Sequence, residues 1–257
     1  MPDYKSNEMM TIAAARALKS SDVCFVGIGM PSAAANLARL THAPDITLIY
    51  ESGTLGTKPS VLPLSIGDGE LCETALTTVS VPEMFRYWLM GGRITVGFLG
   101  GAQIDRFANL NTTVVGPYAK PKVRLPGGGG APEIAISCGE IFIIMPQSKR
   151  SFVPKLDFLT SLGHGEGGDH RIRLGVKTKG PTKLLTDLAV FEPDPRTKEM
   201  TITSIHPGVT RAQIVDSTGW QVRYADTVTE TPAPSARELE VLRALHARTA
   251  RAHGAAA

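Results

Sequence analysis

The chain has 257 residues, of which 42% are hydrophobic and 20% are charged, an ordinary globular composition with enough length to bury a sizeable core. Its net charge of +3, carried by scattered basic residues, does not favour a nucleic-acid or membrane-surface partner. The chain shows no apolar stretch of the roughly 18 residues that a membrane span needs and no signal-peptide core, so we expect a soluble cytoplasmic protein. Three widely spaced cysteines, Cys24, Cys72 and Cys138, are predicted to be reduced core residues.

The first hundred residues alternate between predicted helices and strands. Helices are expected over residues 8–18 and 32–40, and strands over 22–28 and 46–50. A strand, a glycine-containing turn, a helix and a second strand form a βαβ unit with a parallel strand pair. A further segment, residues 83–90, looks helical.

The rest of the chain is predicted to add strands and to end in a helix. Strands are expected over residues 94–99, 133–137, 141–145, 172–176, 184–192 and 200–205. Ser235 and Glu238 form a capping box that opens an amphipathic helix over about residues 235–252. The layout predicts one α/β domain over residues 1–257, with an open, mainly parallel sheet flanked by helices and extended by the later strands.

Glu51 stands where the apolar run of residues 46–50 opens into a glycine-containing loop. A carboxylate at that place is costly unless it has a partner or a task. Ligands of open α/β sheets bind at the carboxyl ends of the strands. A glutamate there can attack an activated acyl group and form a covalent intermediate. A solvated loop glutamate is the alternative interpretation.

Residues 127–130 are four consecutive glycines between Pro126 and Pro132. Glycines let the chain approach a ligand closely, and successive amide groups can point into one spot as an anion-binding nest. Such a nest could hold a phosphate or stabilise the oxyanion that forms when an acyl carbonyl is attacked. A flexible surface linker is the alternative, and the flanking prolines and the strand expected after them argue against it.

Gln103 follows the apolar run of residues 96–99 through Gly100 and Gly101, and its amide could donate to a carbonyl or a carboxylate. The polar residues that follow it are expected to hold the turn through side-chain to backbone bonds. They are Asp105, Asn109 and Asn111.

Two other sequence patterns are only weak evidence for a cofactor or a metal. Gly27 and Gly29 start a dinucleotide fingerprint whose third glycine would fall at Ser32, so a nicotinamide cofactor is the least favoured interpretation. His164 and His170 flank two acidic residues, but the glycines between them do not form a helical metal motif. We expect an ordered polar loop there and predict no metal.

The motifs at residues 50–53, 100–105 and 127–131 together resemble the β subunits of class I CoA-transferases, in the glutaconate CoA-transferase branch. The resemblance covers nearly the whole chain. One departure is Ala108, which stands before Asn109 where the family usually has glycine, and which bears on the local turn rather than on the chemistry.

This resemblance implies an enzyme that transfers CoA from succinyl-CoA to a dicarboxylic oxo acid, 3-oxoadipate, in the degradation of aromatic compounds by the β-ketoadipate pathway. Glu51 would carry the CoA as a glutamyl-CoA thioester. Further residues are implied to contact the substrate or the oxyanion, and these are Gln103, Gly101, Gly129, Gly130 and Ala131. Secondary candidates are Ser52, Gly53 and Gly29.

The resemblance also implies partners. An α-type subunit would complete a hetero-oligomer, which we expect to be a heterotetramer, and coenzyme A would be a substrate with no permanently bound cofactor and no metal. We expect no nucleic-acid or membrane partner. Alternatives are another acceptor such as glutaconate, a CoA-thioester hydrolase or decarboxylase of the same fold, and a ligand-sensing or scaffold subunit without catalysis.

Overall fold

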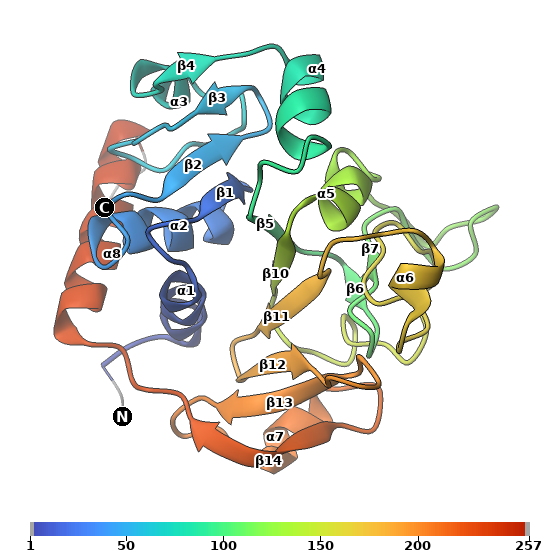
Figure 1. The fold of residues 1–257 in the computed structure, drawn as a ribbon. Coiled ribbons are helices and arrows are strands. Elements are labelled where there is room, and N and C mark those ends of the chain that lie inside the picture. The colour runs from blue at the N-terminus through green and yellow to red at the C-terminus, as the bar shows by residue number, and fades with distance from the viewer. Residues whose placement is uncertain (1–2, 255–257) are drawn as a thin grey trace. The chain divides into compact units, whose positions relative to one another are not determined.

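The computed structural model describes residues 3–254 (Figure 1). The chain divides into two compact units: unit 1 comprises Met1–Phe98 and Ala233–Ala257, and unit 2 comprises Leu99–Pro232. The prediction that residues 1–257 form one domain is not tested by this division and stays a prediction.

In unit 1 the strands are hydrogen-bonded neighbours in the order β5-β1-β2-β3-β4. The strands are β1 (Val23–Val26), β2 (Thr47–Tyr50), β3 (Thr54–Leu55), β4 (Thr77–Thr78) and β5 (Val96–Leu99). β1 pairs in parallel with β2 and with β5, whereas β3 runs antiparallel to both of its neighbours. β1 and β2 are almost wholly buried, as expected for the centre of a parallel sheet.

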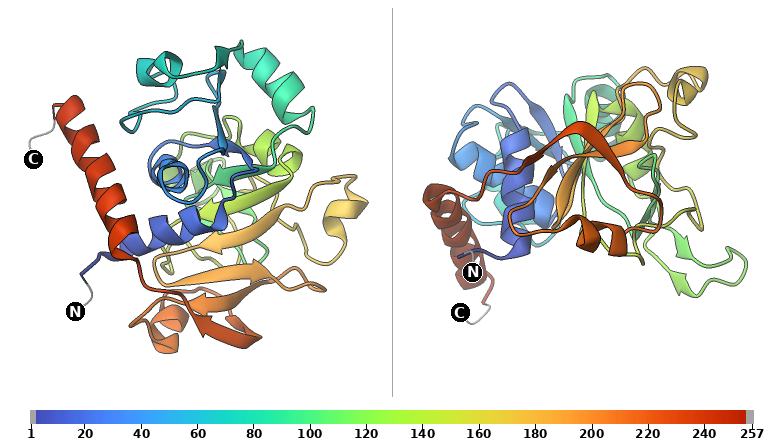
Figure 2. Two further views of the ribbon diagram at one scale, coloured as in Figure 1. Left: turned by 60° about the vertical axis from the view of Figure 1, so that its left-hand side comes forward. Right: turned by 90° about the horizontal axis from the view of Figure 1, so that it is seen from below.

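Three long helices of unit 1 pack against one another (Figure 2). They are α1 (Ser6–Ala17), α2 (Met30–Leu40) and α8 (Ala236–Ala252). Runs of buried alanine, at residues 13–15 of α1 and 33–35 of α2, allow the helix backbones to approach closely. Shorter helical segments are α3 (Gly69–Glu73), α4 (Val81–Glu83) and the π-helical turn η1 (Met84–Leu89).

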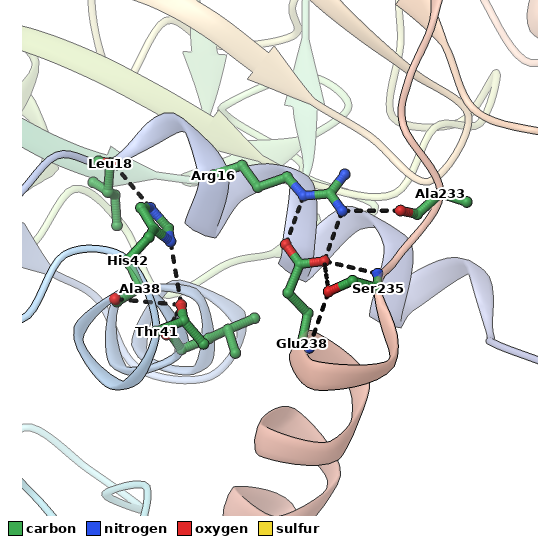
Figure 3. A network of polar contacts seen from close by, with 9 residues as sticks. Arg16, Leu18, Ala38, Thr41, His42, Ala233, Ser235 and Glu238 are labelled. Carbon is green, nitrogen blue, oxygen red and sulfur yellow. Dashed lines mark hydrogen bonds and ion pairs between the residues drawn. The ribbon is translucent and has the colours of Figure 1, made fainter.

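An ion pair between Arg16 and Glu238 links α1 to α8 (Figure 3). Arg16 Nε donates to Glu238 Oε1 at 2.6 Å and Arg16 Nη2 donates to Glu238 Oε2 at 2.7 Å, while Nη2 also donates to the Ala233 carbonyl. Glu238 Oε2 accepts the backbone N–H and the hydroxyl of Ser235 as well. The predicted capping box is therefore confirmed, and it is joined to a two-point ion pair.

In unit 2 the larger set of strands pairs in the order β14-β13-β12-β11-β10. β10 and β11 are parallel, β12 is antiparallel to both of its neighbours, and β13 and β14 are parallel. The strands are β10 (Glu140–Ile144), β11 (Pro181–Leu185), β12 (Ala189–Pro193), β13 (Met200–Ile205) and β14 (Arg223–Glu230).

Two small hairpins and three short helices complete unit 2. The hairpins are β6 (Gln103–Ile104) with β7 (Leu110–Asn111), and β8 (Val114–Val115) with β9 (Val123–Arg124). The helices are α5 (Ala131–Ser137), α6 (His170–Arg173) and α7 (Arg211–Asp216). The hairpin of β8 and β9 projects from the rest of its unit (Figure 2).

The predicted α/β class is confirmed, and so is the C-terminal helix with Leu239, Leu242 and Leu245 buried. Three strand predictions are wrong. Residues 133–137 lie in α5, because Pro132 and Glu133 are first-turn residues that favour a helix start. Residues 172–176 include the end of α6, and residues 184–192 span two strands that meet at a turn held by the Thr186 hydroxyl.

The cysteine prediction is correct for two of the three residues. Cys24 and Cys138 are buried and Cys72 is exposed, and none of these three thiols forms a disulfide. Among the described residues no helix has both the length and the apolar character that crossing a bilayer requires. The cytoplasmic location stays a prediction.

Candidate active site

Glu51 lies at the corner of a tight turn that joins β2 to β3 in unit 1. The Gly53 amide donates to the Tyr50 carbonyl at 3.0 Å, so Glu51 and Ser52 are the two central residues of a β-turn. This is the carboxyl end of a parallel strand, the position at which the sequence predicted it.

The Glu51 carboxylate is half-buried and unpaired. Within residues 3–254 it accepts no hydrogen bond, and no Lys, Arg or His nitrogen lies within 4.0 Å of it. Burial raises its pKa above the ordinary value of 4.5. A carboxylate that is poorly solvated and not neutralised by a cation keeps its oxygen lone pairs available for attack on a carbonyl.

The Tyr50 side chain anchors the end of β2, directly before Glu51. Its side chain is fully buried, and its hydroxyl lies 2.7 Å from the Ser32 hydroxyl and 3.5 Å from Asn36 Nδ2, both on α2. Burial raises the pKa of Tyr50 to about 12, so the phenol stays protonated and can donate. The anchor fixes the end of β2 to the helix that follows β1.

Gly53 makes the turn possible. Its φ is +106°, and a β-carbon added there would lie 1.9 Å from the Val79 carbonyl oxygen. The Gly53 carbonyl in turn accepts the Val79 amide at 2.9 Å. No residue with a side chain fits this position without moving the backbone that carries Glu51.

Two buried hydroxyls beside Glu51 have no partner among the described residues. They are Ser52 Oγ and Thr54 Oγ1. Buried polar atoms are rarely left unsatisfied, so each needs an explanation such as a ligand or a water. Ser52 adjoins the glutamate, which supports its role as a candidate substrate contact.

Gly29 is the N-cap of α2, with a φ of +80°. It follows β1, whose last residue, Val26, pairs with Tyr50. Unit 1 therefore places the start of α2 and Glu51 after two adjacent parallel strands.

The remaining candidates lie in unit 2, where the glycine-rich segment forms one wall of a pocket of about 330 Å³. Gly101 lines the same pocket as Gly127, Gly128 and Ala131. Two motifs that the sequence treated separately, residues 100–105 and 127–131, therefore meet at one cavity. Gly129 and Gly130 are next to the lining residues and do not line the pocket themselves.

The backbone amides of this loop differ in availability. Gly128, Gly129 and Gly130 donate no backbone hydrogen bond in the part of the chain that the structure describes, whereas Ala131 donates to the Gly128 carbonyl at 3.0 Å. Positive φ angles at Gly127 and Gly129, +104° and +51°, turn the chain sharply. Three consecutive amides without a partner in this part of the chain are candidate donors to an anion or an oxyanion.

Gln103 does not line this pocket. Its amide is buried and engaged, because Oε1 accepts Asn111 Nδ2 at 2.7 Å and the Asp157 amide at 3.1 Å, and Nε2 donates to Asp157 Oδ2 at 2.8 Å. Hydrogen bonds from the Gly116 amide and from Gln103 lower the pKa of Asp157. Sequence reasoning missed Asp157, since nothing in the local pattern marks a partner 54 residues away.

The turn after Gln103 is held as the sequence predicted. Asp105 Oδ1 accepts the amides of Phe107 and Asn109, and Asn111 Oδ1 accepts the amide of Thr113. Ala108 sits inside this turn with a φ of +58°, a left-handed conformation that favours glycine. A glycine would adopt this conformation without strain, and the alanine here carries local strain.

The histidine loop is ordered by its own hydrogen bonds. His164 Nε2 lies 2.7 Å from the Pro181 carbonyl, and His170 Nδ1 accepts the Glu166 amide at 2.8 Å. Burial lowers the pKa of His164 to about 4. No group of three or more metal-ligating side chains occurs among the described residues.

Comparison with known proteins places the chain in a family. A family model described as Coenzyme A transferase matches residues 7–217, and the chain belongs to this family. One of its relatives is a subunit of the 3-oxoadipate CoA-transferase of Pseudomonas knackmussii. That relative is 65% identical over 254 residues, which cover 99% of this chain and 98% of the other protein.

Two solved structures are similar to the chain. Glutaconate coenzyme A-transferase from Acidaminococcus fermentans has a TM-score of 0.87 at 31% identity, covering 94% of each chain. The decarboxylase AibA/AibB has a TM-score of 0.82 at 25% identity, covering 98% of each chain. The resemblance to CoA-transferases of the glutaconate branch is confirmed, and with it the prediction of an enzyme of that class.

Proposed function

We propose that this chain is the β-type subunit of an enzyme that transfers CoA from succinyl-CoA to 3-oxoadipate, with Glu51 as the nucleophile. The observation that carries the proposal is the half-buried Glu51 carboxylate, unpaired among the described residues and held on a turn that only glycine at position 53 allows. The relative from Pseudomonas knackmussii supports the choice of acceptor, because its name states that acid.

The chemistry proceeds in two halves. A Glu51 oxygen attacks the thioester carbonyl of succinyl-CoA, and the CoA thiolate leaves to give a glutamyl–succinyl anhydride. The thiolate then attacks the glutamyl carbonyl and expels succinate, which leaves a glutamyl-CoA thioester. The carboxylate of 3-oxoadipate attacks that thioester, and the same steps in reverse yield 3-oxoadipyl-CoA and free Glu51.

Each intermediate keeps its acyl group activated, so the exchange needs no ATP as long as water is kept out. Each attack also creates a tetrahedral oxyanion that needs hydrogen-bond donors. A candidate donor beside Glu51 is the hydroxyl of Ser52. The free amides of Gly128, Gly129 and Gly130 are proposed separately as an anion site of unit 2. Gln103 has a structural role in this proposal. Its hydrogen bonds to Asp157 hold the segment that follows Gly101 in place.

The enzyme works as a hetero-oligomer with an α-type subunit. The Pseudomonas knackmussii relative is named as one subunit of its enzyme, and the decarboxylase AibA/AibB is named for two components. Coenzyme A takes part as a substrate and not as a resident cofactor.

Borohydride trapping tests the proposal. The two-subunit enzyme is incubated with succinyl-CoA, reduced with borohydride and digested, and the modified peptide is mapped by mass spectrometry. We expect a reduced side chain at position 51 and none in the Glu51→Gln enzyme. A label at another residue, or full activity without any label, contradicts the proposal.

The decarboxylase AibA/AibB is a structural neighbour with different chemistry, so the same preparation is assayed for release of carbon dioxide. Exchange of CoA between free acid and thioester without loss of carbon dioxide supports transfer.

A further inference from the structure

Unit 2 contains a second pocket, of about 540 Å³, whose charge distinguishes it from the glycine-rich pocket. Four basic residues line it, and they are Arg171, Lys177, Lys179 and Lys198. No aspartate or glutamate lines it. A volume of this size is typical of small-molecule sites.

Arg171 is the buried cation of this pocket, with only 5% of the residue exposed. Its Nη1 donates to the Gly163 carbonyl at 2.7 Å and to the Leu162 carbonyl at 3.3 Å. Its Nη2 donates to the Thr178 hydroxyl at 2.8 Å and to the Ala135 carbonyl at 3.1 Å. All of these acceptors are neutral. Among the described residues its Nε has no partner, and no carboxylate lies within 4.0 Å of the guanidinium.

Burial lowers the pKa of Arg171 to about 10, so the guanidinium remains charged at neutral pH. A buried charge is strongly unfavourable unless an opposite charge compensates it. Since the described part of the chain supplies no such charge, an anion from outside the chain is the expected compensation.

Lys198 adds a second cation to the lining of this pocket. Its φ is +63°, a left-handed conformation that side chains other than Asn and Asp rarely adopt. Its amide donates to the Asp194 carbonyl at 2.9 Å, which fixes the turn. Strained residues persist where the surrounding structure holds them in place, and this one lies in the wall of the basic pocket.

The other two lysines are exposed at the pocket wall. Lys179 Nζ lies 3.7 Å from Glu140 Oε1, and this carboxylate compensates part of the lysine's charge. Lys177 has no ion pair among the described residues. The pocket therefore keeps a clear excess of positive charge after its nearest carboxylate is counted.

We propose that the basic pocket binds the phosphate groups of a phosphorylated ligand. Arginine and lysine together are the usual phosphate-binding side chains, and a multiply charged phosphate matches several cations better than a single carboxylate does. Two sources share this chemistry: the nucleotide phosphates of coenzyme A, and a separate phosphorylated metabolite. The proposal goes beyond the transfer reaction, because binding here does not require Glu51.

Calorimetric titration of the two-subunit enzyme with pyrophosphate tests the proposal. We expect saturable binding that weakens as salt is added, because exposed charges are screened. Loss of one charged contact, worth about 1.5 kcal/mol, corresponds to about tenfold weaker binding. Lys198→Gly removes such a contact and suits the left-handed backbone, so the variant should bind about tenfold more weakly without a lower melting temperature.

Lys149→Gln is the matched control, because it removes the same charge from an exposed position of unit 2 that does not line the pocket. It should bind pyrophosphate as the unsubstituted enzyme does. Absence of saturable binding in the unsubstituted enzyme, or equal weakening by Lys149→Gln and Lys198→Gly, overturns the proposal.

Competition then separates the two sources. If coenzyme A displaces pyrophosphate and Lys198→Gly weakens both, the pocket holds the phosphates of coenzyme A. If both bind at once, the pocket holds a separate phosphorylated ligand. Either result supports a phosphate site in this pocket. Trapping at Glu51 is a separate measurement, so failure of the phosphate proposal can be distinguished from failure of the proposed transfer reaction.

Discussion

Gly53 and Val79 touch so closely that a β-carbon on residue 53 would lie 1.9 Å from the Val79 carbonyl oxygen. The contact sets the turn that carries Glu51. Gly53→Ala must therefore shift the turn, and a misplacement of about 1 Å at a nucleophile lowers the rate about 100-fold. Steady-state transfer kinetics of the two-subunit enzyme measure this effect.

Gly69→Ala is the matched control for that substitution. Gly69 begins α3, does not have a positive φ, and has no atom within 4 Å of its added β-carbon. We expect unchanged activity and equal or higher stability, since alanine favours a helix over glycine. A similar loss of activity in both variants would mean that the close approach to Val79 does not govern the site.

Substitution of Glu51 separates catalysis from stability. Burial raises the Glu51 pKa above 4.5, so the native state keeps the proton at pH values at which the unfolded chain has released it. This favours folding at low pH, and the benefit is lost as pH rises through the folded-state pKa. Glu51→Gln should therefore be slightly more stable than the parent at pH 7, by less than about 1 kcal/mol because the group is partly exposed.

The stability gain of Glu51→Gln should shrink as pH falls toward 4.5, which denaturant titrations at several pH values measure. Transfer activity should fall by about four orders of magnitude or more, since the nucleophile is gone. Glu51→Asp keeps the charge but retracts it by about 1 Å, so we expect about 100-fold less activity. An active Glu51→Gln enzyme refutes the assigned role.

The ion pair between Arg16 and Glu238 makes a prediction about acid stability. Burial raises the Glu238 pKa, but hydrogen bonds from Arg16 and Ser235 outweigh that effect and bring the pKa to about 2. The stabilisation is present above the ordinary value of 4.5 and is lost as pH falls toward 2. Arg16→Ala should destabilise the chain by roughly 1–3 kcal/mol at pH 7 and less at pH 3.

Thermal denaturation at the two pH values measures that difference. The control is Glu240→Gln, which breaks an exposed i,i+3 pair with Arg237 and should change stability by less than about 0.5 kcal/mol. An effect of Arg16→Ala that is the same at both pH values would show that lost packing, not charge, explains it.

The position of Glu51 could be predicted from sequence because one local pattern, an apolar run that ends in a carboxylate, fixes both the strand and its end. The glycine-rich segment could be found in the same way, since four glycines exclude regular structure. The helix that starts at Ala131 could not, because the short apolar run Ile134 to Ile136 suits a strand as well as a helix.

Tertiary hydrogen bonds explain the features of the site that could not be predicted from the sequence. Gln103 was expected to reach a substrate, and in the structure its amide is satisfied by Asp157, which comes from a distant loop. Tyr50 is tied to Ser32 of α2, a contact that no periodicity indicates. Such pairings depend on how segments fold back on one another, so the sequence marks the residue but not its partner.

The two unpaired hydroxyls beside Glu51 provide the last prediction. Ser52 Oγ and Thr54 Oγ1 are both buried and unsatisfied among the described residues. Removing an unsatisfied hydroxyl should not destabilise the fold, and it can raise stability by up to about 1 kcal/mol. Ser52→Ala and Thr54→Val should therefore both melt at or above the temperature of the parent chain.

The two variants should differ in activity. If Ser52 contacts the substrate or the oxyanion, Ser52→Ala should lower kcat/KM by about 10-fold, the value of one hydrogen bond to a charged group. Thr54→Val keeps the shape of a side chain that lies inside β3, so its kinetics should match those of the parent. Equal kinetics in both variants would show that the Ser52 hydroxyl does not contact the substrate or the oxyanion, and the oxyanion would then depend on other donors.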